Sequence, residues 1–215
     1  MKKFLILIVS ILFLTNLYAD NLEIFQFNSE ELDTLKVRKI RGAKNLTHYS
    51  LGNNTKGSFL RAESKDGGSG LGKEVSVDLD KTPFLNITWK IEKDLSGINE
   101  KSKKEHDFAA RFFVVKKTGL TPLSNKAINY VFSSNEEIGE FWTSPYTKSS
   151  IDYVLSSTKN TLNEWVTVKT NVKEDYKKLH NLDVDMLDGV AIMADTDQSK
   201  KQSISYFQNI YFSAN

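Results

Sequence analysis

Hydrophobic and polar residues alternate along most of the chain from residue 20 onwards. This period of two is typical of β-strands with one buried face, because successive side chains of a strand point to opposite sides. Polar or glycine-rich segments separate the alternating runs, as turns between strands do. The pattern predicts ten strands, near residues 23–27, 57–63, 73–79, 84–92, 107–116, 127–133, 150–156, 164–170, 188–194 and 204–212.

Helix signals are confined to two short segments. Residues 171–180 can form a helix that Asn171 caps at its start, with Lys177 and Lys178 in its last turns. Residues 29–36 are the second candidate.

The predicted loops include a glycine-rich segment at 64–70 and a charged segment at 94–105. The chain contains no linker, no repeat and no low-complexity segment after residue 20. Many short strands with one or two short helices predict an all-β sandwich or barrel. We therefore expect residues 20–215 to form a single domain.

Within the strands, the alternation assigns each side chain to a core face or to an outer face. The core face of residues 84–92 consists of Leu85, Ile87, Trp89 and Ile91. Trp89 is therefore expected to anchor the core between two sheets, and Lys90 to lie on the outer face.

The stretch HDFAARFFVV, residues 106–115, has the same alternation. One face carries Phe108, Ala110, Phe112 and Val114. Asp107 and Arg111 fall on the opposite face, where we expect them to be in contact, either directly or through a shared partner.

Polar residues on outer faces form the first group of candidate site residues. If the strands are neighbours in one sheet, these side chains converge on its surface: Lys90, Asp107, Arg111, Asn129 and Asp195. Two interpretations stay open. The surface is either an ordinary solvated sheet face with an Asp107–Arg111 ion pair, or a shallow groove that binds a ligand.

The N-terminus carries a signal of a different kind. Lys2 and Lys3 precede an apolar run at residues 4–14, and Ala19 is a small residue at the expected cut site. These are the features of a secretory signal peptide, so we expect residues 1–19 to be removed. The apolar run is shorter than the roughly 20 residues that span a bilayer, so no stable membrane insertion is expected after cleavage. The mature protein is expected to be periplasmic or secreted.

Charge and cysteine content narrow the class of partner. The chain has 29 Lys and Arg against 27 Asp and Glu, and loss of Lys2 and Lys3 leaves 27 basic residues. A neutral chain offers no general basic surface to a phosphate backbone, so no nucleic acid is expected. The chain has no Cys, so an exported form must derive its stability from burial rather than from disulfides.

The sequence lacks the motifs of two hydrolytic chemistries, zinc hydrolysis and Ser–His–Asp catalysis. The three histidines lie far apart without zinc-site spacing, and no GxSxG motif is present. Two carboxylates about 5–9 Å apart can hydrolyse a glycoside, and Asp107 with Asp195 is the pair that we nominate for this role. Arg111 beside Asp107 would keep that acid ionised, which does not suit a general acid. The sequence favours a protein without catalytic residues.

Two further motifs allow alternative interpretations. Asp195 and Asp197, in the string DTDQS, can bind a structural calcium ion or close a turn by accepting backbone hydrogen bonds. We favour the turn, and no other cofactor is expected. Trp142 and Tyr146 lie in a predicted loop at 139–147, where exposed aromatic rings could stack on sugar rings. Trp142 could instead fold inward and cap the sandwich.

A series of strings recurs in a fixed order along the chain: FLRAES, SGL, TWKIE, HDFAARFFVV, AINYVFSS, SPYT, GVAIMADTDQS and YFQNIYF. In this series the chain resembles the bacterial domain-of-unknown-function family numbered 3047, over nearly all of the mature sequence. The resemblance implies export and a jelly-roll sandwich similar to galactose-binding domains and carbohydrate-binding modules, and it implies no established activity.

The resemblance also bears on single positions. The residues that sit where the family motifs have them are Asp107, Arg111, Asn129, Pro145, Tyr146, Asp195 and Asp197. The family tends to have basic residues where Asn86 and Thr88 stand, and Trp where Phe132 stands. The resemblance therefore does not imply an anionic ligand held by the strand at 84–92.

Taken together, these patterns predict an exported jelly-roll β-sandwich that binds a saccharide or an envelope glycan without catalysis. Hydrogen bonds to the ligand would come from Lys90, Asp107, Arg111, Asn129 and Asp195, and stacking from Trp142 and Tyr146. The alternative is a structural or protein-interaction domain of the cell envelope, with Asp107–Arg111 as a framework ion pair. A glycoside hydrolase that uses Asp107 and Asp195 is the third hypothesis.

Overall fold

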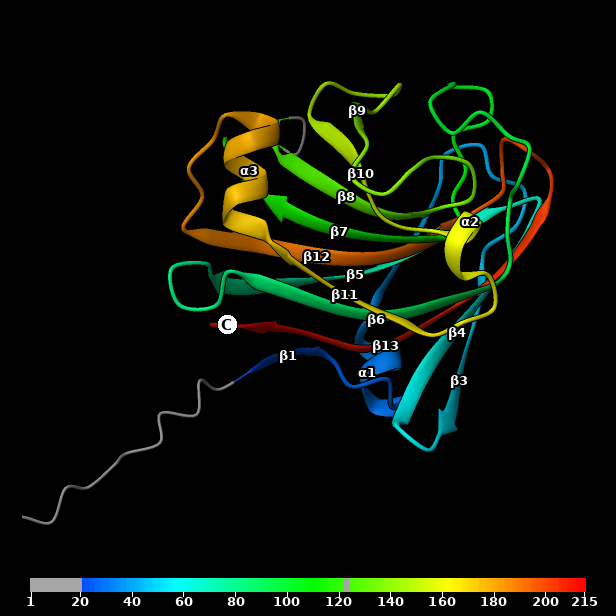
Figure 1. The fold of residues 1–215 in the computed structure, drawn as a ribbon, viewed down its shortest axis with the longest axis horizontal. Helices are drawn as coiled ribbons and strands as arrows, with labels where there is room; N and C mark the ends of the chain where they lie inside the picture. Colours follow the sequence, from blue (N-terminus) through cyan, green and yellow to red (C-terminus); the bar gives the residue numbers. More distant parts are fainter. Residues whose placement is uncertain (1–20, 122–123) are drawn as a thin grey trace, which may run out of the picture.

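Two packed β-sheets make up the molecule in the computed structural model, which describes residues 21–121 and 124–215 (Figure 1). The expected signal peptide at residues 1–19 lies outside the described residues. The six-stranded sheet contains, in spatial order, β11 (Val166–Asn171), β6 (Phe84–Lys93), β13 (Gln202–Ser213), β4 (Gly57–Lys65) and β3 (His48–Asn54), with β1 (Leu22–Phe25) also paired to β13.

The seven-stranded sheet carries most of the candidate site residues. Its spatial order is β2 (Lys36–Lys39), β5 (Gly68–Asp78), β12 (Met186–Asp195), β7 (Ala110–Lys116), β8 (Lys126–Ser133), β10 (Ser150–Ser157) and β9 (Phe141–Thr143). Neighbouring strands in both sheets are antiparallel except for β8 and β10, which run parallel.

The core lies between the sheets and is built from alternate residues of the strands, as the period of two predicts. Leu85, Ile87, Trp89 and Ile91 of β6 are all buried. Trp89 donates from Nε1 to Ser156 Oγ of β10 at 2.9 Å, and its ring centroid lies 5.4 Å from that of Phe132 on β8. The prediction that Trp89 anchors the core between the two sheets is confirmed.

The longest helix is α3 (Val172–His180), which confirms the prediction at 171–180. Asn171 Oδ1 accepts a hydrogen bond from Glu174 N at 3.2 Å, as an N-cap residue does. The helix follows β11 of the six-stranded sheet, and Tyr176 donates from its hydroxyl to the Val114 carbonyl of β7 at 2.9 Å. Helix α3 therefore links the six-stranded sheet to the seven-stranded sheet.

Two shorter helices complete the described elements. The candidate at 29–36 is α1 (Ser29–Thr34), which Asn28 caps. The single turn α2 (Thr158–Thr161) was not indicated by the sequence pattern, because it buries only one side chain, that of Thr158.

Three strands were not predicted, and one predicted loop is largely strand. All four residues of β2 are exposed, β3 has no buried residue and β9 has only three residues, so none shows a clear apolar face. The segment at 64–70 turns only at Asp66 and Gly67 before β5 begins at Gly68. A Cβ on Gly67 would lie 2.4 Å from the Asn45 carbonyl oxygen, so the close approach of these chains requires glycine.

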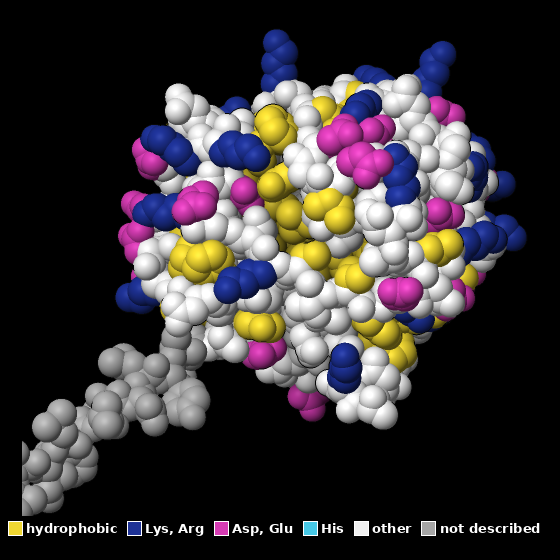
Figure 2. All heavy atoms as spheres, in the orientation of Figure 1, with side chains coloured by type: hydrophobic (Ala, Val, Ile, Leu, Met, Phe, Trp, Pro, Cys, Tyr) yellow, Lys and Arg dark blue, Asp and Glu magenta, His cyan; other side chains and the backbone are white. Residues whose placement is uncertain are grey.

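The surface agrees with the near-neutral composition. Charged side chains of both signs are interspersed over the face drawn in Figure 2, with apolar side chains between them. Among the described helices, none is long and apolar enough to cross a membrane.

Candidate functional site

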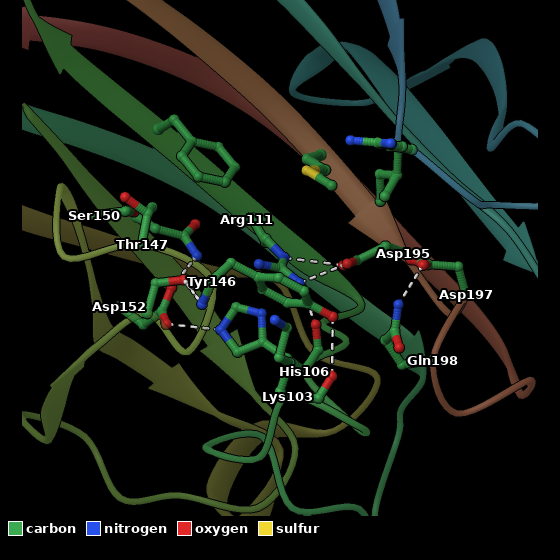
Figure 3. Close-up of a pocket in the computed structure, with 16 residues that line it drawn as sticks. Lys103, His106, Arg111, Tyr146, Thr147, Ser150, Asp152, Asp195, Asp197 and Gln198 are labelled. Carbon is green, nitrogen blue, oxygen red and sulfur yellow. Dashed lines mark hydrogen bonds and ion pairs between the residues drawn. The ribbon is translucent and has the colours of Figure 1, made fainter. Parts of the chain in front are cut away.

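A hollow of about 580 Å³ lies over the outer face of the seven-stranded sheet (Figure 3). Its lining includes a compact set of polar side chains: His106, Arg111, Asn129, Asp152, Asp195 and Asp197. Three of the strands that supply them are adjacent in the sheet, β12, β7 and β8, and β10 follows β8. The prediction that Arg111, Asn129 and Asp195 converge on one sheet surface is therefore confirmed.

Arg111 forms an ion pair with Asp195 at one end of the hollow. Nε donates to Asp195 Oδ1 at 2.9 Å, and Nη2 donates to Oδ2 at 2.5 Å. Nη2 also donates to the His106 carbonyl oxygen at 2.7 Å, and the guanidinium carbon lies 4.3 Å from the centroid of the Phe108 ring. Both charged side chains are buried, with exposed fractions of 5% and 4%. The bidentate partner of Arg111 is thus Asp195, so of the two predicted kinds of contact with Asp107 the direct ion pair is wrong.

Asp107 has a different role because β7 begins at Ala110, later than predicted. Asp107 lies in the loop before the strand and accepts hydrogen bonds from the backbone N–H groups of Gln198 and Ser199, at 3.1 Å and 2.5 Å to Oδ2. It therefore closes the turn that follows β12. The DTDQS segment forms a turn, as favoured, although its carboxylate acceptor comes from outside that segment.

The late start of β7 also changes the place of Phe108. Instead of sharing the core face of Ala110, Phe108 packs with Val131 and Val154 in a small separate cluster. Trp142 of β9 covers this cluster, with its ring stacked on Phe108 at a centroid distance of 6.3 Å. Trp142 does not line the hollow, so it is not placed to stack on a ligand there. It folds onto side chains of the outer sheet face and does not cap the sandwich.

Asp107, Asp195 and Asp197 bring one carboxylate oxygen each to within 4.8 Å of one another. Burial raises the pKa of Asp195, against the lowering effect of Arg111, and the nearby Asp107 raises it further. Burial and Asp107 also raise the pKa of Asp197. The Arg111 guanidinium already supplies a positive charge to this cluster through its hydrogen bond to Asp195 Oδ1. The same oxygen also accepts a hydrogen bond from Phe108 N at 3.0 Å. Both oxygens of Asp195 thus accept hydrogen bonds from the protein, and Asp197 Oδ2 accepts one from the Gln198 side chain at 2.6 Å.

A second buried chain of hydrogen bonds crosses the other end of the hollow. His106 Nε2 lies 2.8 Å from Asp152 Oδ2, and Asn129 Nδ2 donates to Asp152 Oδ1 at 2.5 Å. Burial lowers the pKa of His106, although Asp152 acts in the opposite direction. The imidazole is therefore neutral at neutral pH, and we assign its proton to Nε2 because Asp152 is an acceptor.

Asn129 Oδ1 is buried and has no hydrogen-bond partner among the described residues. A buried polar atom without a partner costs free energy that a ligand donor can recover. His106 and Asp152 were not singled out from the sequence. The alternation at 150–156 did contain a signal for Asp152, because it places Asp152 opposite the core residue Ile151 on the outer face.

Tyr146 stands at the rim of the hollow and is 49% exposed. Its hydroxyl donates to the Lys103 carbonyl oxygen at 2.9 Å, and its ring meets His106 edge to face at a centroid distance of 5.5 Å. The loop before β7 therefore fixes the ring, with Lys103 Nζ over it at 5.3 Å from the centroid, while about half of the residue stays exposed.

Lys90 does not belong to this site. It lies on β6 of the six-stranded sheet, with Nζ 4.3 Å from the Tyr206 ring centroid and 5.7 Å from that of Trp165. The prediction that Lys90 converges with Arg111 is wrong, because alternation within a strand does not tell which strands are neighbours.

Comparisons with known proteins support the fold and leave the function open. A family model described as "Protein of unknown function (DUF3047)" matches residues 33–211. Among curated protein sequences, no relative matches the chain.

Solved structures with a similar fold include two carbohydrate-binding modules of cellulosomal cellulases from Clostridium thermocellum. The family 11 module of Lic26A-Cel5E has a TM-score of 0.52 and 14% identity, covering 92% of this chain and 96% of the module. The family 30 module of Cel9D-Cel44B has a TM-score of 0.52 and 9% identity, covering 91% and 98%. The predicted jelly-roll sandwich is confirmed.

Proposed function

The chain belongs to the DUF3047 family, and we propose that this member is a non-catalytic module that binds a saccharide in the hollow above the seven-stranded sheet. The likeness in fold to carbohydrate-binding modules supports a saccharide as the class of ligand. The observation that carries the proposal is the hollow itself, in which an accessible aromatic ring faces a rigid set of buried polar groups.

The polar groups are suited to sugar hydroxyls, which both donate and accept hydrogen bonds. Asn129 Oδ1 is the buried acceptor that still lacks a donor. Asp152 and His106 hold Asn129 and each other in place, so the acceptor is preorganised and little conformational entropy is lost when a ligand binds. Tyr146 offers an apolar ring face at the rim, on which a sugar ring can stack.

The roles of Asp107 and Asp195 in this proposal are structural. Their oxygens accept hydrogen bonds from Arg111 and from backbone N–H groups, and both side chains are buried. We infer that they position the loop before β7, which carries His106, rather than attack or protonate a glycosidic bond. An Asp195→Asn variant that abolished measured sugar release, with the fold intact, would establish the hydrolase instead.

The test is a thermal-unfolding screen of the protein against neutral and charged oligosaccharides, followed by titration of any ligand that it reveals. A ligand at ten times its Kd adds about 1.4 kcal/mol of stability, which raises Tm by roughly 3–6 °C at this size. Tyr146→Ala should weaken binding by about fivefold to tenfold, because a stacked ring contributes about 1–1.4 kcal/mol.

Phe141→Ala provides the matched control. Phe141 is an aromatic residue of β9, the strand that precedes Tyr146 in the sequence. Its exposed fraction is 48%, against 49% for Tyr146, and it does not line the hollow. Equal loss of affinity in both variants would place the ligand elsewhere. A screen without any shift would favour the structural or protein-interaction role in the envelope, with Arg111–Asp195 as framework pair.

We also propose that the protein acts in the periplasm or outside the cell, after removal of residues 1–19. The support is the sequence of these residues, with two lysines before an apolar run. N-terminal sequencing of the protein from fractionated cells tests this. We expect a mature chain that begins at Asp20, and an intact Met1 in the cytoplasmic fraction would contradict it.

A further inference from the structure

A second hollow of about 400 Å³ continues across the same sheet face. Phe113 lines both hollows, so they meet at this residue. Strand register gives the row of outer-face positions that crosses the whole sheet: Lys36, Gly72, Ala191, Phe113, Asn129, Asp152 and Trp142. The proposed saccharide site is therefore one end of a longer trough that reaches the β2 edge.

The floor of the trough near β2 has almost no side chains. Gly72 pairs with Lys36 on one side and with Ala191 on the other, and Gly70 pairs with Arg38. A Cβ on Gly72 would make only ordinary contacts, the nearest at 3.5 Å, so the fold does not require glycine there. The missing side chain instead leaves open space beside two cationic residues.

The sequence that includes β2 and its surroundings carries many basic residues and no acidic ones. Residues 34–62 contain no Asp or Glu, but they contain seven Lys and Arg. Three of these line the trough, namely Lys36, Arg38 and Arg41. Lys36 and Arg38 project from the same face of β2, about 7 Å apart along the strand.

The positive charge of these three residues is not neutralised by the protein. No ion pair joins any of them to a carboxylate within the described residues. The other cations that line the β2 end are paired, Lys73 with Glu31 at 2.8 Å and Lys117 with Glu74 at 3.7 Å. Glu74 and Asp188 also line the second hollow, and both are paired, with Lys117 and Lys116. Lys36 and Arg38 in the second hollow and Arg41 in the first therefore keep their charge without an acidic partner among the described residues.

We propose that the ligand is an acidic glycan, whose anionic groups are held by Lys36, Arg38 and Arg41 while its sugar rings lie along the glycine floor towards Tyr146. This inference rests on the proposed saccharide-binding function and specifies the class of saccharide. Carboxylate, sulfate and phosphate groups share the required chemistry. Each can accept two parallel hydrogen bonds from a guanidinium, and each is attracted by the compact positive charge of a lysine ammonium. The neutral net charge of the mature chain does not oppose this, because the cations are gathered at one edge.

The experiment measures binding by isothermal titration to pairs of polymers that differ only in charge. The first pair is de-esterified polygalacturonate and highly methyl-esterified polygalacturonate, and the second is dextran sulfate and dextran. Poly(glycerol phosphate) represents a phosphate source. We expect at least one acidic polymer to bind ten times more tightly than its neutral counterpart, and this preference to shrink as salt is raised.

Two double variants locate the effect. Lys36→Ala with Arg38→Ala should remove the preference for the acidic polymer, whereas Lys39→Ala with Lys44→Ala should change affinity by less than twofold. The control pair removes the same charge from the same segment, but neither residue lines the trough. Gly72→Val should also abolish binding by filling the floor without changing charge.

The outcomes separate this inference from the function on which it rests. Equal binding of charged and neutral polymers would overturn the acidic ligand and leave saccharide binding standing. Equal losses in the two double variants would mean general attraction between charges and would also overturn it. Failure of every polymer, neutral or acidic, to bind would contradict the saccharide-binding function and the inference with it.

Discussion

At the scale of single residues, the site depends on two buried polar networks that meet in the loop before β7. Arg111 binds the His106 carbonyl oxygen and Asp195, while the His106 ring binds Asp152. The backbone and side chain of one residue thus belong to different networks. Loss of either network should therefore disturb the position of the same loop.

Removal of Arg111 tests the first network. Arg111→Ala leaves Asp195 buried and without its counter-charge, which should lower the free energy of unfolding by about 3–5 kcal/mol. Arg61→Ala is the control, because the Arg61–Glu63 pair is more exposed, at 28% and 30%, and should cost less than about 1 kcal/mol. Denaturant unfolding measures both. Similar losses of unfolding free energy in the two variants would show that the buried ion pair stabilises the protein no more than the exposed one.

Titration of His106 tests the second network. Burial lowers its folded-state pKa below the ordinary value of about 6.5, so the folded protein binds fewer protons than the unfolded chain in that pH range. The stability from neutral His106 is present above pH 6.5 and is lost as pH falls towards the folded-state pKa.

The comparison is between the wild type and His106→Asn, by denaturant unfolding at intervals from pH 8 to pH 5. The stability advantage of the wild type should narrow as pH falls, because the variant lacks this proton uptake. Other titrating groups, His180 among them, act on both proteins and cancel in the difference. A stability difference that stays constant over this range would contradict the burial effect.

The sequence predicted the sheet face of a side chain correctly where that face depends only on the alternation within one strand. The period of two placed Arg111 and Asn129 correctly, since it needs only local alternation. It failed for Asp107, which lies before the strand begins, and for Lys90, whose strand belongs to the other sheet. Strand pairing depends on contacts between distant segments, and no local pattern contains it.

At the scale of secondary-structure elements, buried alternating strands were foreseen and exposed ones were not. Each of the ten predicted strands overlaps an observed strand, because each has an apolar face. The exposed edge strand β2 has no such face, and its contribution is the row of cations beside the glycines of β5. Strand β2, which supplies Lys36 and Arg38 to the trough, was thus a strand that hydrophobic patterning could not predict.

Helix α3 gives a prediction at this scale. Asn171→Ala removes the N-cap hydrogen bond to Glu174 N and should cost about 1 kcal/mol of stability. Asn181→Gly at the other end of the helix should cost nothing, because Asn181 is in the left-handed conformation with φ of 51°. Thermal unfolding of the two variants tests the pair. A loss in Asn181→Gly as large as in Asn171→Ala would contradict this account of the helix ends.

At the scale of the whole molecule, stability is expected to come from packing between the sheets and not from a bound metal. Treatment of the purified protein with EDTA should leave Tm unchanged, because Arg111 and backbone N–H groups already satisfy the carboxylates of Asp107 and Asp195. A lower Tm that calcium restores would instead support the calcium site at Asp195 and Asp197.

The whole molecule also presents a second aromatic surface, which makes the location of the ligand a question of its own. On the outer side of the six-stranded sheet, Phe59, Trp165 and Tyr206 pack together, with ring centroids 5.5–5.9 Å apart, and Lys90 lies over two of the rings. This cluster is the natural competitor of the trough for a sugar ring.

Hydrogen–deuterium exchange with and without the best-binding glycan shows whether the ligand lies in the trough. If the glycan binds there, exchange should slow in the loop before β7, around residues 103–111, and in the segment around residues 144–150, with no change in β4 or around Trp165. Protection confined to β4, β13 and the residues around Trp165 would contradict it and would place the ligand on the six-stranded sheet.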